Sequence, residues 1–218
     1  VYEIYDNLLR YECRIHGETT IRICHNLMAP PGLSFAKITH VYSHPVALNQ
    51  CLDFFRDNPQ ISKEIHYDTA GSARMVMTDR PEGAAAIASA SAAEIYGARI
   101  LKRGIEDDRQ NFTRFFLLAR GDQAAPARSP KDRKTAWKTS IVFSVANQSG
   151  SLFRSIAAFA LRDLSLTKVS SRPLRGKPFD YLFYLDVLGH LEDPAMANAL
   201  RHLDELADMM KVLGCYPK

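Results

Sequence analysis

Ser43 and Gln50 are the first two residues whose types and spacing could do chemistry. Ser43-His44-Pro45 is typical of a helix start, because Ser is a good N-cap and Pro is favoured in the first turn. If Ser43 caps that helix, Gln50 lies two turns on, and seven steps of about 100° bring the two within about 20° of one face. Free N–H groups at a helix start attract an anion such as a carboxylate. The alternative is a plain N-cap with an exposed glutamine.

A second candidate group lies at the start of an apolar segment. There Asn111, Thr113 and Arg114 supply an amide, a hydroxyl and a cation. Polar groups that enter a core usually have a partner or a ligand. In a regular strand Thr113 and Arg114 face opposite sides, so they serve one site only at a bulge or at the strand's end. The alternative is a structural ion pair between Arg114 and Asp107 or Asp108.

The stretch 68–73, DTAGSA, follows an expected strand and opens a helix. It is another helix N-terminus that could hold an anion. The alternative is that Asp68 or Thr69 only caps the helix. Two helix starts and one arginine together suggest a small substrate that carries more than one carboxylate.

Other chemistries find little support in the sequence. His40 and His44 are four residues apart, but Pro45 fits poorly in a helix carrying both, and no Cys or acidic ligand recurs at zinc-like spacing. We therefore expect no metal. A G-x-S-x-G elbow, a G-x-G-x-x-G loop and a Walker pattern are all absent.

Composition excludes several classes of protein. The 218 residues are 46% hydrophobic and 24% charged, as in soluble globular proteins. A net charge of +4 is too mild to indicate nucleic-acid binding, and no uncharged run is long and apolar enough to span a membrane. The four cysteines lack C-x-x-C spacing, which favours free thiols in a reducing cytoplasm.

These candidates must be positioned by two segments, 1–120 and 137–218, which a Pro-containing linker at 121–136 separates. In the first segment, strands alternate with helices, which predicts a mostly parallel, three-layer α/β unit. The expected helices lie at 1–9, 43–57, 69–78 and 91–96, and the expected strands at 19–24, 65–67, 83–88, 100–101 and 112–119.

The second segment reads β-α-β-β-α-β, the ferredoxin-like order. The expected strands are 139–145, 166–171, 181–187 and 212–216, and the expected helices are 150–161 and 194–210. The loop from Asn147 to Leu152 leads into the first helix, and its backbone N–H groups could take the carboxylate of an amino acid. Gly150 would permit a close approach. The alternative is a turn that caps the helix through Ser149 or Ser151.

Several ordered motifs resemble a known family. Residues 1–120 resemble the later part of the prephenate dehydratase catalytic domain, and 137–218 resemble the ACT regulatory domain that follows it. The pattern is also similar to the plant arogenate dehydratases. The motifs that carry the match are 43–51 (SHPVALNQC), 68–73 (DTAGSA), 92–97 (AAEIYG), 111–115 (NFTRF), 159–163 (FALRD), 171–173 (SRP), 179–181 (FDY) and 213–217 (LGCYP).

The resemblance implies a two-lobed, periplasmic-binding-protein-like α/β fold with an incomplete first lobe, a second lobe at roughly 40–105, and a ferredoxin-like ACT domain. It implies conversion of prephenate to phenylpyruvate with no cofactor, or the corresponding reaction of arogenate. Thr113 would assist the departing hydroxide and Arg114 would bind a carboxylate. The other implied site residues are Ser43, Gln50, Thr69, Ser72 and Asn111, with Phe115 walling the ring.

The resemblance also implies feedback by L-phenylalanine and a homodimer or homotetramer formed through 137–218. The implied ligand site comprises Asn147, Gly150, Ser151, Leu152, Ser171, Arg172 and Pro173. The family's Glu-Ser-Arg-Pro reads SSRP at 170–173, and its Gly-Ala-Leu reads GSL at 150–152.

The family's glycine-rich opening and its Pro-x-Glu-Asn-Ser motif have no match here. We therefore expect residues 1–218 alone to be nearly inactive. A phenylalanine-sensing protein without catalysis and a solute-binding receptor remain alternatives, and the missing secretion signal argues against the receptor. The expected location is the cytoplasm, or the plastid stroma in a plant or alga.

Overall fold

In a computed structural model, residues 3–121, 123, 126, 128, 135–174 and 179–218 are described, so most of the predicted linker at 121–136 lies outside the described residues. The chain forms two compact units. One, the five-stranded unit, is Thr20–Thr113, and the other, the ferredoxin-like unit, combines Val1–Thr19 with Arg114–Lys218.

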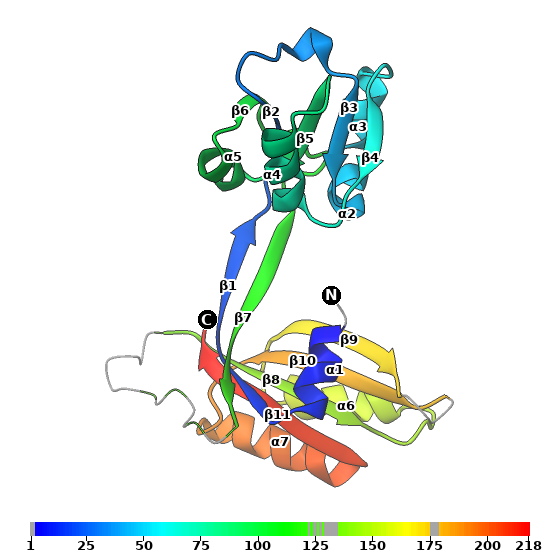
Figure 1. Ribbon diagram of the computed structural model, residues 1–218. Helices are drawn as coiled ribbons and strands as arrows, with labels where there is room; N and C mark the ends of the chain where they lie inside the picture. Colours follow the sequence, from blue (N-terminus) through cyan, green and yellow to red (C-terminus); the bar gives the residue numbers. More distant parts are fainter. Residues whose placement is uncertain (1–2, 122, 124–125, 127, 129–134, 175–178) are drawn as a thin grey trace. The chain divides into compact units, whose positions relative to one another are not determined.

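Alternating side chains build the five-stranded unit in three layers (Figure 1). Its sheet has the order β4-β3-β5-β2-β6. On β5, Ala85 and Ile87 pack with α2 and α3, whereas Ala84, Ala86 and Ala88 pack with α4 and α5. The period of two along a strand sends successive side chains to opposite faces, so each face finds its own helical layer. The elements are β2 (Asn26–Ala29), η1 (Phe35–Lys37), β3 (His40–Ser43), α2 (Pro45–Asn49), α3 (Leu52–Asp57), β4 (Ser62–Ile65), α4 (Thr69–Asp79), β5 (Ala84–Ala88), α5 (Ala90–Tyr96) and β6 (Arg99–Lys102).

The three-layer α/β prediction is confirmed, but the sheet is less parallel than expected. Strand β3 pairs in parallel with β4 and β5, while β2 runs antiparallel to both β5 and β6. The mixed direction follows from the connection into β2, which the chain reaches from β1 and not through a helical crossover.

The ferredoxin-like unit confirms the predicted β-α-β-β-α-β order. Its four-stranded sheet has the order β11-β8-β10-β9, and every neighbouring pair is antiparallel. One face packs on α6 and α7, and the other packs on α1, β1 and β7. The elements are α1 (Glu3–Arg10), β1 (Cys13–Arg22), β7 (Phe112–Arg120), β8 (Trp137–Ser144), α6 (Ser151–Ala160), β9 (Leu166–Pro173), β10 (Tyr181–Leu188), α7 (Pro194–Leu206) and β11 (Met209–Pro217).

Two predicted element boundaries are wrong for physical reasons. Helix α7 ends at Leu206 because Met209 already pairs with Ser144 of β8, so Met210 joins the same core from a strand. The first helix of the five-stranded unit breaks at Gln50, where α2 ends and α3 begins at Leu52.

Strands β1 and β7 pair with each other, and the division between the units runs through both strands. On β7 it falls between Thr113 and Arg114. The ferredoxin-like unit therefore includes more than the predicted regulatory segment 137–218.

Candidate functional site

Three polar side chains meet at one end of the five-stranded unit. The Gln50 carbonyl oxygen Oε1 lies 2.8 Å from His25 Nε2 and accepts a hydrogen bond from Asn111 Nδ2 at 3.2 Å. Because that oxygen can only accept, the His25 ring must carry its proton on Nε2. With Oε1 held by two donors, the Gln50 amide nitrogen is turned toward other partners.

These three residues lie at the ends of secondary-structure elements, and the fold brings those ends together. Gln50 is the C-cap of α2, His25 directly precedes β2, and Asn111 directly precedes β7. The backbone of Ile23 donates to the Asn111 carbonyl at 2.8 Å, which fixes the start of β7 beside the approach to β2.

Two carboxylates hold the surrounding loops. Glu106 accepts from the His25 backbone at 2.9 Å and pairs with Arg22 Nη2 at 3.0 Å, and its side chain is 1% exposed. Asp107 accepts from the backbone N–H groups of Leu52 and Asp53 at 2.8 and 3.0 Å, so it caps α3. Both carboxylates are therefore used to build the site.

A cavity of about 250 Å³ opens at this cluster. Its lining residues include three acids and neither Lys nor Arg, so a dicarboxylate ligand would need a cation from beyond this lining. At Cys51, the residue after Gln50, burial raises the pKa of the thiol to about 12, and the charges of Asp107 and Glu106 add to that rise. Cys51 therefore stays a neutral thiol at physiological pH. The lining residues are Asn49, Gln50, Glu106, Asp107, Asp108 and Asn111.

The predicted N-cap role of Ser43 is wrong. Ser43 is the last residue of β3, it is fully buried, and its hydroxyl donates to the Ile87 carbonyl at 2.7 Å. His44 is the N-cap instead, and its Nδ1 accepts from the Val46 backbone at 3.2 Å. Ser43 and Gln50 therefore do not share a helix face, since Ser43 belongs to β3 and Gln50 is the C-cap of α2.

The second expected helix start is capped as its simpler alternative predicted. The Asp68 carboxylate accepts from the Gly71 backbone at 2.9 Å. Ser72 is fully buried, and its hydroxyl donates to the Asp68 carbonyl at 2.6 Å. Thr69 is the first residue of α4 and half-buried. The substrate contacts expected of Ser72 and Thr69 stay predictions.

Thr113 and Arg114 have separate surroundings. Thr113 is half-buried, and its hydroxyl makes no hydrogen bond to any residue that the structure describes. Arg114 forms ion pairs with Asp186 at 2.6 Å and Glu18 at 3.4 Å, both within the ferredoxin-like unit. The alternative of a structural ion pair is therefore the arrangement found, with Asp186 and Glu18 as partners in place of Asp107 or Asp108. Phe115 is 48% exposed.

The predicted ligand loop borders a cavity of about 80 Å³ next to α6. Gly150 has a φ of 79°, the left-handed region that favours glycine, and Ser151 donates its backbone N–H to Gln148 at 3.1 Å. Asn147, Ser151 and Leu152 line this cavity together with Val145, Ala146, Gln148, Tyr181 and Phe183.

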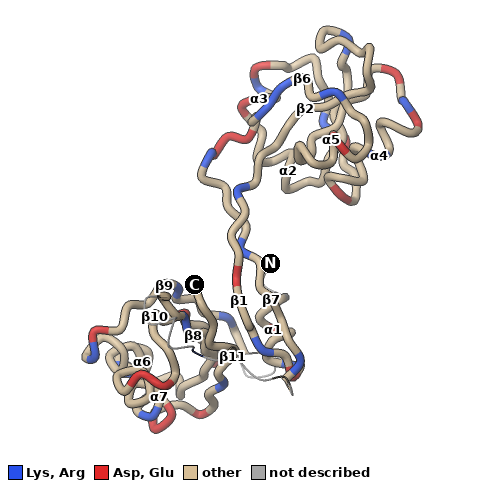
Figure 2. The backbone as a smooth tube through the Cα atoms, turned by 90° about the vertical axis from the view of Figure 1, so that its left-hand side faces the viewer, with Lys and Arg blue, Asp and Glu red and all other residues tan. Residues whose placement is uncertain are grey.

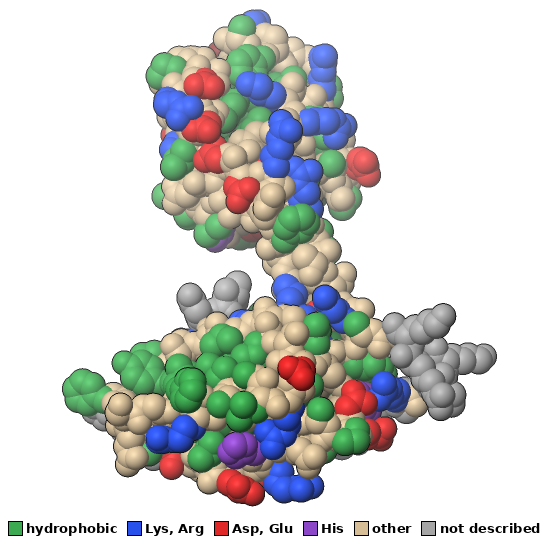
Figure 3. All heavy atoms as spheres, turned by 180° about the vertical axis from the view of Figure 1, so that it is seen from behind, with side chains coloured by type: hydrophobic (Ala, Val, Ile, Leu, Met, Phe, Trp, Pro, Cys, Tyr) green, Lys and Arg blue, Asp and Glu red, His purple; other side chains and the backbone are tan. Residues whose placement is uncertain are grey.

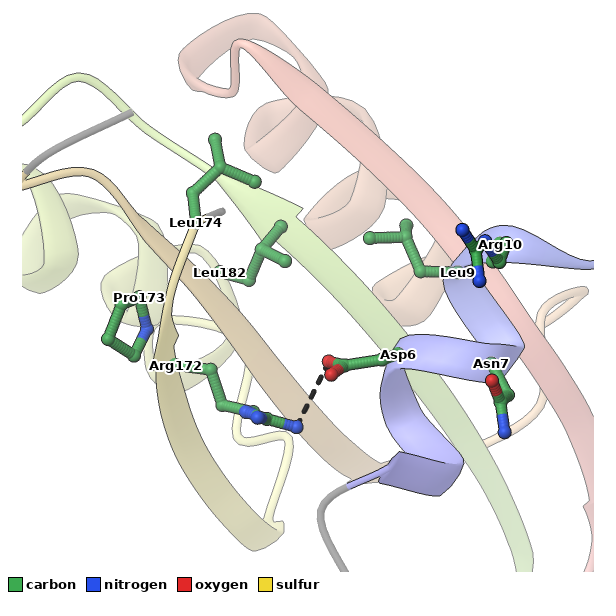
Figure 4. A pocket seen from close by; sticks show the side chains of 8 residues that line it. All are labelled: Asp6, Asn7, Leu9, Arg10, Arg172, Pro173, Leu174 and Leu182. Carbon is green, nitrogen blue, oxygen red and sulfur yellow. Dashed lines mark hydrogen bonds and ion pairs between the residues drawn. The ribbon is translucent and has the colours of Figure 1, made fainter. Parts of the chain in front are cut away.

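The other predicted ligand residues are split between the two faces of β9. Ser171 is opposite Phe183, so it shares the face of the small cavity, whereas Arg172 is opposite Leu182 on the other face. There Arg172 pairs with Asp6 of α1 at 3.0 Å (Figure 4). It lines, with Pro173, a different cavity of about 480 Å³.

Sequence reasoning missed His25 and Glu106 as site residues. The available signal was a histidine and an amide directly before a buried apolar run, and the sequence alone did not show which loop would contact them. In the part of the chain that is described, no cluster of three His, Cys, Asp or Glu could hold a metal ion. No described helix is long and apolar enough to cross a membrane. Figure 2 shows Lys and Arg interspersed with Asp and Glu along both units.

A family model and a curated relative indicate one family. The family model for prephenate dehydratase matches residues 1–123. Arogenate dehydratase/prephenate dehydratase 2 of Arabidopsis thaliana is 41% identical over 100% of this chain and 58% of its own length. The chain thus spans little more than half the length of this curated relative.

Two solved structures resemble the whole chain. A prephenate dehydratase from Arthrobacter aurescens in complex with L-Phe has a TM-score of 0.86 and 29% identity over 100% of this chain and 70% of that one. A protein described as GqqA, a novel type of quorum quenching acylase, has a TM-score of 0.84 and 32% identity over 96% of this chain and 74% of that one.

Proposed function

Because the chain belongs to the prephenate dehydratase family, we propose that the complete protein converts prephenate to phenylpyruvate, with arogenate as the alternative substrate. The ring carboxylate leaves as CO₂, and the electrons of its broken C–C bond form a ring double bond. That shift expels the C4 hydroxyl as hydroxide, which takes up a proton to leave as water. Aromatisation supplies the driving force, so the protein has to hold the carboxylates and assist the departing hydroxide.

The observation that carries this proposal is the cluster of Gln50 and Asn111, which lie 61 residues apart in sequence and hydrogen-bond within the five-stranded unit. Thr113 lies two positions beyond Asn111, so the two side chains point to the same side of the backbone. The Thr113 hydroxyl, which has no hydrogen-bond partner among the described residues, donates to the departing hydroxide. The Gln50 amide nitrogen donates to a substrate oxygen. A positioned donor of this kind is worth about a hundredfold or more in turnover.

The acidic lining of the cavity means that residues 20–113 alone should bind a dicarboxylate poorly. A dicarboxylate cannot enter beside Glu106, Asp107 and Asp108 unless cations compensate its charge. Contact of Thr69 with the substrate is part of the same proposal, whereas Ser43 and Ser72 are fully buried and hydrogen-bonded to backbone carbonyls.

The experiment uses the protein expressed from its complete coding sequence. Phenylpyruvate formation from prephenate, and phenylalanine formation from arogenate, are followed in parallel. We expect Thr113→Ala to lower kcat about a hundredfold. The matched control is Thr78→Ala, on an exposed position of α4, which should keep the activity of the parent. Equal turnover of parent and Thr113→Ala would remove Thr113 from the mechanism.

An acylase activity is the competing candidate, because one similar structure carries that description. Amide hydrolysis needs a nucleophile or a water activated by a base. The His–Ser hydrogen bond of the described residues joins His40 and Ser62 at 3.3 Å on an exposed edge of the sheet, away from the cavity. Release of a carboxylic acid from N-acylated substrates, unchanged in Thr113→Ala, would favour the acylase.

We also propose feedback by L-phenylalanine at the loop 147–152. The loop cavity, the left-handed Gly150 and the L-Phe complex of the Arthrobacter relative support it. Arg172, on the opposite face of β9, would belong to such a site only through a second copy of the chain. Calorimetry with L-phenylalanine on the whole chain tests this, and no heat at millimolar ligand would remove the proposal.

A homodimer or homotetramer is the expected assembly. Strand β9 is an edge of the four-stranded sheet, and unpaired edge strands need cover. Hydrophobic side chains gather over this unit on the face drawn in Figure 3. Phe153, Leu161 and Val169 are 76%, 77% and 52% exposed. The compartment proposed is the cytoplasm, or the plastid stroma in a plant or alga, and the Arabidopsis relative is named as chloroplastic.

A further inference from the structure

A buried charge cluster fixes the strand that carries Thr113. Arg114 Nη1 lies 2.6 Å from Asp186 Oδ2, and Arg114 Nε lies 3.4 Å from Glu18 Oε2. The side chains of Asp186 and Glu18 are 3% and 9% exposed. Asp186 also accepts from the Ser140 hydroxyl at 2.6 Å, and Lys138 forms an ion pair with Glu18. The cluster thereby joins strands β1, β7, β8 and β10.

The Arg114 guanidinium is held on its other sides as well. It lies over the Phe116 ring, with Cζ 4.4 Å from the ring centroid. Burial by itself would lower the pKa of Arg114. The hydrogen bond to Asp186 and the charge of that carboxylate outweigh the effect of burial, so the pKa of Arg114 is raised. Arg114 therefore stays charged and paired throughout the pH range of an enzyme assay.

This arrangement leaves little of Arg114 for a substrate. Bidentate binding of a carboxylate uses two N–H groups on one edge of the guanidinium. Nε is paired with Glu18 and Nη1 with Asp186, so each edge already has one of its two nitrogens engaged, and only Nη2 lacks a partner among the described residues. The carboxylate-binding role implied by resemblance would require these buried ion pairs to break.

We propose that Arg114 is a positioning residue, which anchors β7 to the ferredoxin-like sheet through Asp186 and Glu18 and so holds the neighbouring Thr113 hydroxyl in place. Arg114 is the first residue of the ferredoxin-like unit on β7, and Thr113 is the last residue of the five-stranded unit. Successive side chains of a strand face opposite sides, so Arg114 and Thr113 leave β7 on opposite sides of its backbone. This inference rests on the proposed dehydratase activity for its kinetic part.

The kinetic test compares Asp186→Asn and Arg114→Gln in two backgrounds, with and without Thr113→Ala. Misplacement of a catalytic group by about 1 Å costs up to about a hundredfold. We expect each variant to lower kcat between about tenfold and a hundredfold, with KM changed less than about twofold. In the Thr113→Ala background neither substitution should lower kcat further, because no hydroxyl remains to be positioned. The conservative Arg114→Lys should recover part of the kcat that Arg114→Gln loses.

A carboxylate-binding arginine gives the opposite pattern. Arg114→Gln would then raise KM at least about tenfold, Asp186→Asn would not, and the Arg114→Gln effect would persist in Thr113→Ala. That result overturns the inference. The matched control is Arg128→Gln, whose partner Asp193 lies at 2.5 Å in the same unit and outside β7.

Amide hydrogen exchange on the 218-residue chain gives a readout that does not need the activity. Exchange along 115–119 should become faster in Asp186→Asn and in Arg114→Gln, and stay unchanged in Arg128→Gln. If a single substitution prevents folding, the double Arg114→Gln/Asp186→Asn variant removes both charges, a change that buried pairs tolerate better. Unchanged exchange in β7 overturns the inference, whereas inactivity of the parent enzyme with faster β7 exchange overturns only the dehydratase proposal.

Discussion

His25 offers a sharp test of how the site is assembled, because it touches the Gln50 side chain from a position that is 5% exposed. His25→Phe keeps a planar ring of similar size and removes the Nε2–H that Gln50 Oε1 accepts at 2.8 Å. Asn111 then remains as the partner of that oxygen among the described residues, at 3.2 Å. The Gln50 amide is free to rotate, so its nitrogen is presented to the substrate for less of the time.

The size of the effect follows from one hydrogen bond. A neutral intramolecular hydrogen bond contributes about 0.5–1.5 kcal/mol to the free energy of unfolding, so His25→Phe should destabilise the fold by about 1 kcal/mol. If the donor of Gln50 acts mainly in the transition state, a barrier increase of about 1–2 kcal/mol lowers kcat/KM about five- to thirtyfold. His25→Gln, which restores an amide donor, should recover part of that loss.

The assay is steady-state phenylpyruvate formation combined with urea unfolding of the same preparations. His40→Phe is the control, because the partner of the His40 ring among the described residues is the exposed Ser62, and His40 does not line the cavity. A double variant with Gln50→Ala completes the cycle, and its kcat/KM should match that of Gln50→Ala alone. Parent-like kcat/KM in His25→Phe despite lower stability, or additive losses in the double variant, would refute the orienting role of His25.

Three other predictions concern stability and assembly. The raised pKa of Cys51 contributes stability that is fully present below the unfolded value of 9.0 and is lost as pH rises toward about 12. The unfolding free-energy difference between the parent and Cys51→Ala should therefore shrink between pH 8 and 11 in urea titrations. A Cβ at Gly214 would collide with the Ile15 carbonyl oxygen, so Gly214→Ala should cost about 1–3 kcal/mol, and an unchanged melting temperature would contradict the close approach of β11 to β1. Light scattering at micromolar concentration should give at least a dimer mass, and a strictly monomeric mass would argue against assembly through β9.

The sequence was most informative where the pattern is local. Alternation of strands and helices predicted both α/β units, because side-chain period reports which faces are buried. Ser43-His44-Pro45 misled for a local reason as well, since the strand continues through Ser43 and moves the cap to His44. The sequence Ser-His-Pro fits a cap at Ser43 as well as a strand that ends at Ser43 with the cap at His44, so it does not distinguish the two.

Long-range pairing could not be predicted from the residues alone. Asp107 and Asp108 were the nearby options if Arg114 formed a structural ion pair. The partners found are Glu18 and Asp186, and Asp186 is 72 residues away. Likewise the contact of Glu106 with His25 spans 81 residues. Charge attraction specifies the type of partner but not its position, which depends on the strands that the fold brings together.

The four-stranded sheet of the ferredoxin-like unit should not be stable when it is cut out of the chain, although its strands all lie within residues 137–217. A piece cut out at residue 137 would keep Lys138 and Asp186 but lose Glu18 and Arg114, leaving one cation and one carboxylate buried without their counter-ions. It would also uncover the apolar face on which Leu8 and Ile15 pack. A chimera or a biosensor that borrows this sheet must therefore take along α1, the first part of β1 and β7, even though those pieces are distant in sequence.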